Sequence, residues 1–337
     1  MNEKNTFNSR FLQHVGIDVP VIGGPMYPCS NPELVAAVSA AGGIGIVQPI
    51  SLTYVHGYKF REGLQYIRQL TDKPVGMNAL IEQSSKTYHR RMAQWIDIAL
   101  EEGVRFFITS LGKPDWVVKK VHAAGGVVYH DVTERKWAAK GVDGGVDGLI
   151  AVNQNAGGHA GSVSREELFD DLLQFDLPII CAGGIATAND FSETLRIGYQ
   201  GVQMGTRFIA TQECTASNAY KEAIIRAQAE DILLNERITG VPVAVIRSPG
   251  RQAKDLKAGF LARYMLRSRK MKYLMRTIYA LRSIHQLKKS LHEARQKEEL
   301  WQAGKSVAGI DRIESVGDII AQFSQVRIEL QEVSSYN

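Results

Sequence analysis

Two turns in the second half of the chain have the residue types of a phosphate-binding site. Gly183-Gly184 ends the apolar run 177–184, and Gly205-Thr206 lies within the run 201–208. Glycines let the backbone approach a bound group closely. Gly205-Thr206 stands where a short helix would begin, and the free N–H groups there favour an anion. The alternative is that these glycines only form tight turns. Because both turns fit at once, we favour a phosphate site.

A histidine follows closely spaced glycines before these turns. Residues 155–161 read NAGGHAG and place three glycines around His159. Such a loop is expected to be open and mobile, and an imidazole titrates near neutrality, which suits proton transfer. The alternative is a loop histidine that hydrogen-bonds its own backbone. Because a phosphate site is predicted beside this loop, we predict that His159 is catalytic.

Other candidates stand at the ends of apolar runs. Asn78 is suited either to binding a planar heterocycle or to closing a neighbouring turn, and the sequence does not choose. Pro25-Met26 is suited to a wall against a ring, although methionine is more often core. His130 is a reserve acid or base for which a structural role is favoured. No metal site is predicted, because the three cysteines form no CxxC pair.

These residues require a scaffold, and the apolar runs predict one. Continuous runs suit strands that are covered on both faces of a parallel sheet. Eight such runs alternate with amphipathic stretches, and eight βα units make a closed barrel. The runs occupy 19–24, 43–48, 74–80, 104–110, 126–132, 147–153, 177–184 and 201–208. We therefore predict an α/β fold, a TIM (β/α)8 barrel over residues 10–250, with its site at the carboxyl ends of the strands.

A doubly wound open sheet is the structural rival, because it also alternates strands and helices. Its dinucleotide fingerprint needs GxGxxG directly after the first strand. The nearest match, Gly43-Ile44-Gly45, precedes its apolar run and lacks the third glycine. The predicted helices 31–41, 88–102 and 114–124 fit either fold, so the count of eight runs favours the barrel.

The chain changes character after the eighth run. Residues 209–240 are expected to be helical. Residues 251–297 hold 14 Lys or Arg against two acids, which leaves 26 bases and 33 acids elsewhere. We therefore predict a basic helical insertion or lid at 251–300 on an acidic body. Residues 301–331 return to turn and helix patterns and are expected to pack back on the barrel.

Composition limits the remaining classes of function. The chain is 45% apolar and 22% charged, which is ordinary for a globular protein. The first residues lack the apolar region of a secretory signal, and no apolar run reaches the roughly 18 residues of a membrane span. We expect a cytoplasmic protein whose partner is a small-molecule substrate, with no nucleic acid. Binding of nucleic acid or a membrane surface by the basic segment ranks lowest, and a homodimer is compatible with the sequence.

Several motifs resemble the nitronate monooxygenase family, formerly called 2-nitropropane dioxygenases, and the related FMN-dependent enoyl-acyl-carrier-protein reductase II. They are PVIGGPM, AAGGIGIV, NAGGHAG, CAGGIATANDF and GVQMGTRFIATQEC. The resemblance implies noncovalent FMN in a TIM-like barrel, with His159 facing the flavin's reactive edge. The cofactor contacts that it implies are Pro25, Met26, Asn78, Gln154, Gly157, Gly158, Ala182, Gly183, Gly184, Gln203, Met204, Gly205 and Thr206.

The activity that the resemblance implies is oxidation of an alkyl nitronate by O2 to a carbonyl compound and nitrite. Two departures make this less direct: Val152 stands where the family has Gln, and Asn155 stands where it has Glu. Gln154 or Asn153 is a candidate replacement. The alternative is an NAD(P)H-dependent flavin reductase acting on a quinone or an enoyl thioester, since a cationic segment would steer an acidic carrier protein.

Overall fold

The computed structural model describes residues 9–81, 86–236, 242–247 and 301–335. Eight parallel strands close into a barrel, because β8 pairs with β1 as well as with β7. The strands are β1 (Val21–Gly23), β2 (Ile44–Val47), β3 (Val75–Leu80), β4 (Phe106–Ser110), β5 (Val127–Val132), β6 (Gly148–Val152), β7 (Ile179–Ala182) and β8 (Gly201–Met204). The predicted TIM barrel is confirmed, and the open-sheet rival is excluded.

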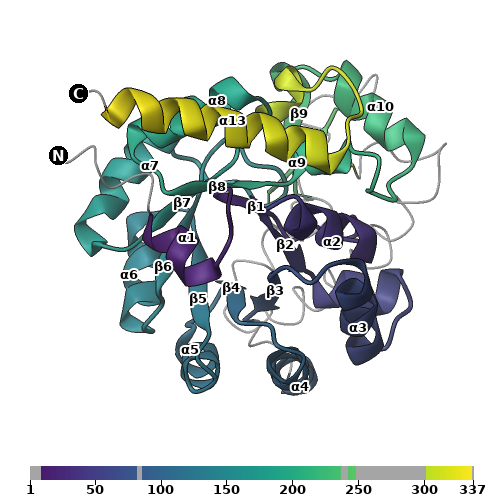
Figure 1. Ribbon diagram of the computed structural model, residues 1–337, viewed down its shortest axis with the longest axis vertical. Helices are drawn as coiled ribbons and strands as arrows, with labels where there is room; N and C mark the ends of the chain where they lie inside the picture. The colour runs from purple at the N-terminus through teal and green to yellow at the C-terminus, as the bar shows by residue number, and fades with distance from the viewer. Residues whose placement is uncertain (1–8, 82–85, 237–241, 248–300, 336–337) are drawn as a thin grey trace.

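Helices surround the barrel and connect its strands (Figure 1). The connecting helices are α2 (Pro32–Ala40), α3 (Phe60–Leu70), α4 (Lys86–Glu101), α5 (Asp115–His122), α6 (Arg135–Asp143), α7 (Arg165–Leu172) and α8 (Ala188–Ile197). The predicted start of α2 is confirmed, with Asn31 at the N-cap and a proline in the first turn. The later helix α13 (Val316–Ser335) packs against α2 and α8, so it joins the first and last parts of the helical ring.

The interior of the barrel is closed at its N-terminal end and partly polar at its C-terminal end. Helix α1 (Arg10–Val15) covers the N-terminal end, where Phe11 packs against the rings of Phe106 and Tyr129. Above these rings lies an apolar layer that includes Ile22, Ile46, Ile108, Ile150 and Ile180. Since side chains alternate along a strand, Ser110, Asp131 and Gln203 occupy inward positions nearer the C-terminal end, and Asn78 is inward on β3. Val152 and Ala182 are inward there too, so this end of the interior combines polar and apolar side chains.

The segment after β8 differs from the helix predicted over residues 209–240. Helices α9 (Thr206–Ile209) and α10 (Asn218–Arg226) are followed by β9 (Ile232–Asn235), which pairs antiparallel with β10 (Val243–Ile246). The helical prediction was therefore wrong for β9, because a short apolar run takes its structure from the partner strand rather than from local periodicity. The predicted basic insertion at 251–300 lies outside the described residues.

The remaining elements are short. A π-helical turn spans Ser51–Val55, and 3-10 turns span Leu173–Phe175, Ala229–Asp231 and Lys305–Gly309. Among the helices of the described residues, none combines the length and apolar character that crossing a bilayer requires. The same residues contain no cluster of three or more side chains suited to holding a metal ion.

His130 is a structural residue on the outer face of β5. Thr109 Oγ1 lies 2.8 Å from His130 Nδ1, and the imidazole packs beneath Gly141 of α6. Burial lowers the pKa of His130 to about 4, from an ordinary value of 6.5. The imidazole is therefore neutral in the folded protein at neutral pH and does not face the mouth of the barrel, which agrees with the structural role favoured from the sequence.

This placement predicts an acid-dependent loss of stability. Between pH 6.5 and about 4 the unfolded chain protonates His130 and the folded chain does not. Stability should therefore fall as the pH drops through this window, by roughly 3 kcal/mol in all. Urea unfolding of the wild type and His130→Asn at several pH values measures it. The difference in unfolding free energy between the two proteins should shrink from pH 7 to pH 4, and a constant difference would contradict the assignment.

Candidate active site

The predicted site residues come together at one end of the barrel. Pro25 and Met26 follow β1, Asn78 lies on β3, and His159 belongs to the loop after β6. The two glycine turns follow β7 and β8. Ala182, Gln203 and Met204 lie at the ends of those two strands. All of these positions lie at the carboxyl ends of parallel strands in one closed barrel, so they share its C-terminal mouth, which is where enzymes of this fold carry their active sites.

The turn after β7 requires glycine. Gly183 and Gly184 have φ angles of 113° and 83°, a region that L side chains rarely adopt. A Cβ added to Gly183 would lie 2.5 Å from the backbone nitrogen of Ala156, and one on Gly184 would contact Asn155 at 3.2 Å. The two glycines therefore let the β6 loop pack directly on the β7 turn.

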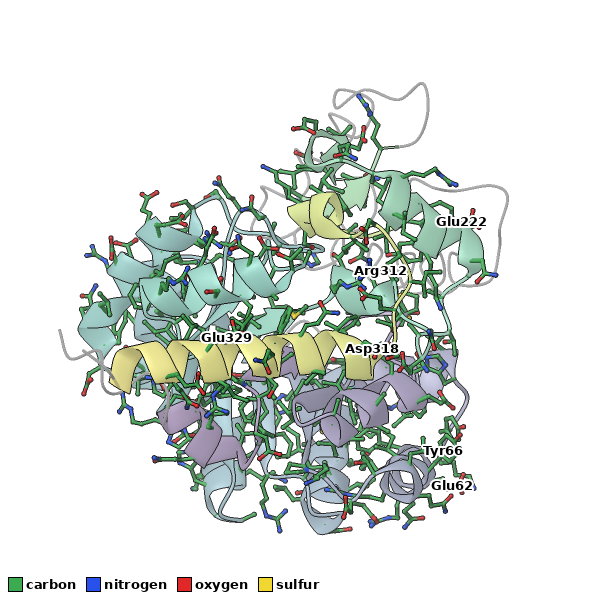
Figure 2. All side chains as sticks on the ribbon, turned by 45° about the horizontal axis from the view of Figure 1, so that its top comes forward. Glu62, Tyr66, Glu222, Arg312, Asp318 and Glu329 are labelled. Carbon is green, nitrogen blue, oxygen red and sulfur yellow. The ribbon has the colours of Figure 1, made fainter. Side chains whose placement is uncertain are left out.

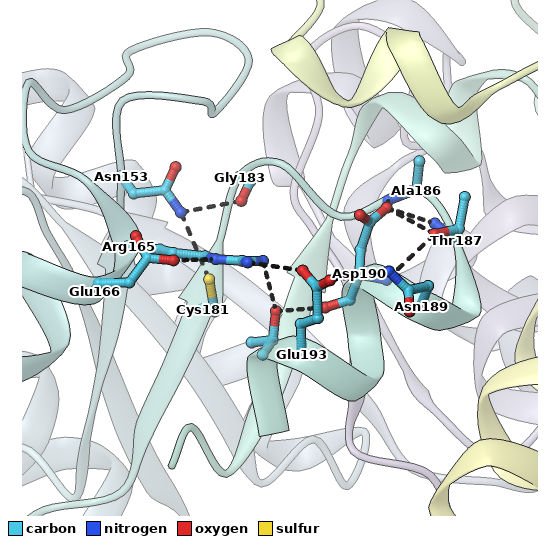
Figure 3. Close-up of polar contacts among 11 residues, drawn as sticks. Asn153, Arg165, Glu166, Cys181, Gly183, Ala186, Thr187, Asn189, Asp190 and Glu193 are labelled. Carbon is cyan, nitrogen blue, oxygen red and sulfur yellow. Dashed lines mark hydrogen bonds and ion pairs between the residues drawn. The ribbon is translucent and has the colours of Figure 1, made fainter. Parts of the chain in front are cut away.

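A buried asparagine joins the two loops. Asn153 is fully buried, and its Nδ2 donates to the carbonyl of Gly183 at 2.9 Å (Figure 3). Its Oδ1 accepts the backbone N–H of Asn155 at 2.8 Å. On the far side of the turn, the carboxylate of Asp190 accepts the backbone N–H groups of Ala186 and Thr187. The glycine turn is therefore held from both sides, and Asn153 acts as a positioning residue.

The NAGGHAG loop has backbone contacts to the C-terminal part of the chain that the sequence did not predict, although Gly157 and His159 are exposed. The carbonyl of Gly158 accepts the N–H of Ala244 in β10 at 2.7 Å. A Cβ on Gly157 would lie 2.9 Å from the nitrogen of Gly304. Lys305 donates its backbone N–H to the Asn155 carbonyl at 2.9 Å. Gly157 is thus required because backbone from the C-terminal part of the chain packs on it.

The turn after β8 is anchored to the same C-terminal segment. Thr206 Oγ1 accepts the N–H of Gly304 at 2.9 Å, which leaves the hydroxyl hydrogen available as a donor. Arg207 is 3% exposed; it donates to the carbonyl of Arg312 at 3.1 Å and forms an ion pair with Glu314. Figure 2 labels Arg312 in the loop that leads to α13. The backbone of this turn is therefore held by buried contacts.

Three predicted contact residues have distinct settings. Met26 packs over the β8 turn, where a Cβ on Gly205 would lie 3.3 Å from its sulfur. Asn78 is buried, and its Nδ2 donates weakly to the Ile108 carbonyl at 3.4 Å. Gln154 is exposed, and its backbone N–H donates to the Val163 carbonyl. These settings favour Met26 and Asn78 as parts of the mouth more than they favour Gln154.

His159 has the protonation state of a proton acceptor. Its side chain is accessible to solvent, yet the surrounding protein lowers the pKa of the imidazole by desolvation. A lowered pKa leaves the ring neutral at neutral pH, so one ring nitrogen carries a lone pair that accepts a proton or a hydrogen bond.

Asp131 is a polar residue of the mouth that the sequence pattern did not single out. It lies on β5 two residues after Tyr129, so both side chains are inside the barrel, whereas the neighbouring His130 is outside. The signal was present in the strand alternation: a carboxyl at the inward position of a strand end. Burial raises the pKa of Asp131 to about 7, against the opposing effect of a hydrogen bond from Gln203.

The fold agrees with comparisons to known proteins. The family model described as nitronate monooxygenase matches residues 8–325. The structure of FabK from Thermotoga maritima superposes with a TM-score of 0.77 at 27% identity, covering 98% of this chain and 99% of that one. A nitroalkane oxidase from Streptomyces ansochromogenes superposes with a TM-score of 0.72 at 20% identity, which shows the fold alone.

Two curated relatives extend this comparison. The chain is 31% identical over 245 residues to a (3aS,4S,5R,7aS)-5-hydroxy-7a-methyl-1-oxo-octahydro-1H-indene-4-carboxyl-CoA dehydrogenase of Rhodococcus jostii, covering 72% of this chain and 67% of the relative. It is 27% identical to a probable nitronate monooxygenase of Staphylococcus saprophyticus, covering 72% and 79%. Fold, site and relatives together define a flavin-dependent oxidoreductase. Within that class, the chain belongs to the nitronate monooxygenase family.

Proposed function

We propose that the barrel mouth binds FMN, with the phosphate at the turns that carry Gly183-Gly184 and Gly205-Thr206. The residues present fit this group. Both turns expose backbone without side chains, and buried contacts hold them in place. The mouth also contains two buried acceptors, Asp131 Oδ1 and Gln203 Oε1, that have no hydrogen-bond partner among the described residues. A flavin supplies ring N–H and ribityl O–H donors, and when bound it supplies the redox chemistry.

The activity that we propose is oxidation of an alkyl nitronate, of the propionate 3-nitronate type, by O2 to a carbonyl compound and nitrite. The observation that carries it is a neutral His159 on a loop that packs directly against the phosphate turn. A neutral imidazole takes the acidic C–H proton of a nitroalkane, or orients the nitronate that this proton loss produces. The family match and the relative in Staphylococcus saprophyticus support this substrate class.

A second candidate is oxidation or reduction of an acyl thioester. It is favoured by the relative in Rhodococcus jostii, whose name describes a dehydrogenase of a carboxyl-CoA compound. The end of β6 and the loop after it also fit this reading, because Val152, the last residue of β6, and Asn155 depart from the sequence that is usual in nitronate monooxygenases. The Asn155 side chain lies beside Gly184, so this departure lies within the proposed site.

Anaerobic reduction of the bound flavin separates the candidates. The FMN-loaded protein is mixed in turn with ethylnitronate, propionate 3-nitronate, NADH, NADPH and a hydroxyacyl-CoA, and the visible flavin band is followed. Fast bleaching by a nitronate, with nitrite formed once O2 is admitted, is the expected result. If the flavin stays oxidised with both nitronates but is bleached by NADH, NADPH or the hydroxyacyl-CoA, the first proposal is wrong and the second is favoured.

A further inference from the structure

The polar floor of the mouth spans the barrel. Asp131 lies on β5 and Gln203 on β8, and the strands β6 and β7 separate them in the sheet. Their side chains are nevertheless joined by a hydrogen bond. Because both residues occupy inward positions, this bond crosses the barrel interior rather than running along the sheet. The pair lies directly above the apolar layer and faces the open end.

Asp131 and Gln203 each have one unsatisfied hydrogen-bond acceptor. Asp131 Oδ1 and Gln203 Oε1 are shielded from solvent and receive no hydrogen bond from the described residues. A buried acceptor without a donor costs about 1–3 kcal/mol, so native interiors rarely keep one. Two such atoms in one interacting pair indicate that the donor arrives with a ligand, since the apolar layer below offers none.

We propose that Asp131 is a flavin-binding residue, whose Oδ1 accepts an N–H or O–H of FMN while Gln203 holds the carboxyl in place. This inference rests on the proposed binding of FMN and adds a contact on β5, across the barrel from β1. Two parts of FMN carry such donors, namely the imide N–H of the ring and the hydroxyls of the ribityl chain. The nearness of Gln203 to the Gly205-Thr206 turn places the ribityl chain within the same region.

The Asp131 carboxyl destabilises the folded protein when flavin is absent. Burial raises its pKa, so the folded state resists ionisation of Asp131 and is destabilised relative to the unfolded chain above pH 7. A residue kept only for stability would not have this property. Removing the charge should therefore leave the flavin-free protein at least as stable at pH 8, while weakening its complex with FMN.

The test compares Asp131→Asn with the wild type and with Asp147→Asn. Asp147 is a matched control outside the mouth, because its carboxylate accepts the Val128 N–H at 2.7 Å and pairs with His122. FMN affinity is measured by fluorescence titration, and the melting temperature is measured without flavin at pH 8. D131N should bind FMN about tenfold more weakly or worse, as loss of a hydrogen bond to a charged group implies, without melting lower. D147N should melt lower and bind FMN normally.

The outcomes separate this inference from the one on which it rests. A wild type that fails to bind FMN would refute the proposed function. A wild type that binds FMN, beside a D131N variant that binds equally well, would overturn only the role of Asp131. Asp131→Ser repeats the test if the first variant does not fold. Titration with 3-methyl-FMN identifies the donor: an imide contact makes the D131N effect vanish for this analogue, and a ribityl contact preserves it.

Discussion

Replacing His159 by alanine is expected to leave FMN bound and to slow reduction of the flavin by substrate by roughly 10²–10⁴-fold, the usual contribution of a general acid or base. His159 stands on the loop that contacts the Gly183-Gly184 turn, and desolvation lowers the pKa of its imidazole, which keeps the ring neutral at neutral pH. The loop is held by backbone contacts of Gly157 and Gly158, so loss of the side chain should not move it.

The rate is measured by anaerobic stopped-flow mixing of the FMN-loaded variant with nitroethane, whose C–H proton the imidazole would take, and with ethylnitronate, which has already lost that proton. His14→Ala is the control, because His14 lies at the closed end of the barrel beside Tyr129. That variant should reduce its flavin at the wild-type rate. An H159A variant that reduces its flavin as fast as the wild type would remove His159 from the mechanism.

Gly183→Ala is expected to weaken FMN binding about tenfold or more, the effect of losing one hydrogen bond to a charged group. A methyl group at this position would lie 2.5 Å from the Ala156 nitrogen and 2.7 Å from Asn153 Oδ1. Neither contact can be relieved without moving the β7 turn or the β6 loop. Both moves displace the proposed phosphate site.

Gly125→Ala is the matched control for the backbone conformation. Gly125 also has a positive φ angle, 71°, but an added methyl group there meets nothing within 4 Å. This variant should lose about 1–2 kcal/mol of stability and bind FMN normally. Fluorescence titration with FMN and thermal unfolding measure both variants. Equal FMN affinity in G183A and the wild type would contradict the assignment of this turn to the phosphate.

The barrel was predictable because each βα unit carries its own signal. The apolar runs 104–110 and 126–132 match the bounds of β4 and β5 to within two residues. Parallel strands that are buried on both faces have continuous apolar sequence. The hairpin of β9 and β10 was not predictable in the same way. Its strands of four residues each depend on pairing with one another and on contacts with Gly158 and Gln302.

Candidate site residues could be predicted where a local motif marks them. They could not be predicted where the signal is the face of a strand on which a residue lies. Glycine turns and a histidine loop are visible in sequence, so Gly183 and His159 could be named as candidates, and the structure places both at the C-terminal mouth. Asp131 was missed because only the inward or outward direction of β5 distinguishes it from His130. The restraint of the NAGGHAG loop was missed because its partners, Gly304 and Ala244, are remote in the chain.

The proposed FMN site at the two glycine turns of the mouth predicts which flavin the protein retains. The purified protein is incubated with a mixture of FMN, FAD and riboflavin, and the unbound flavins are removed. The protein is then denatured, and the flavin that it releases is identified. We expect stoichiometric FMN from the wild type and from H159A, and little from G183A. Release of FAD or of no flavin from the wild type, or of stoichiometric FMN from G183A, would contradict it.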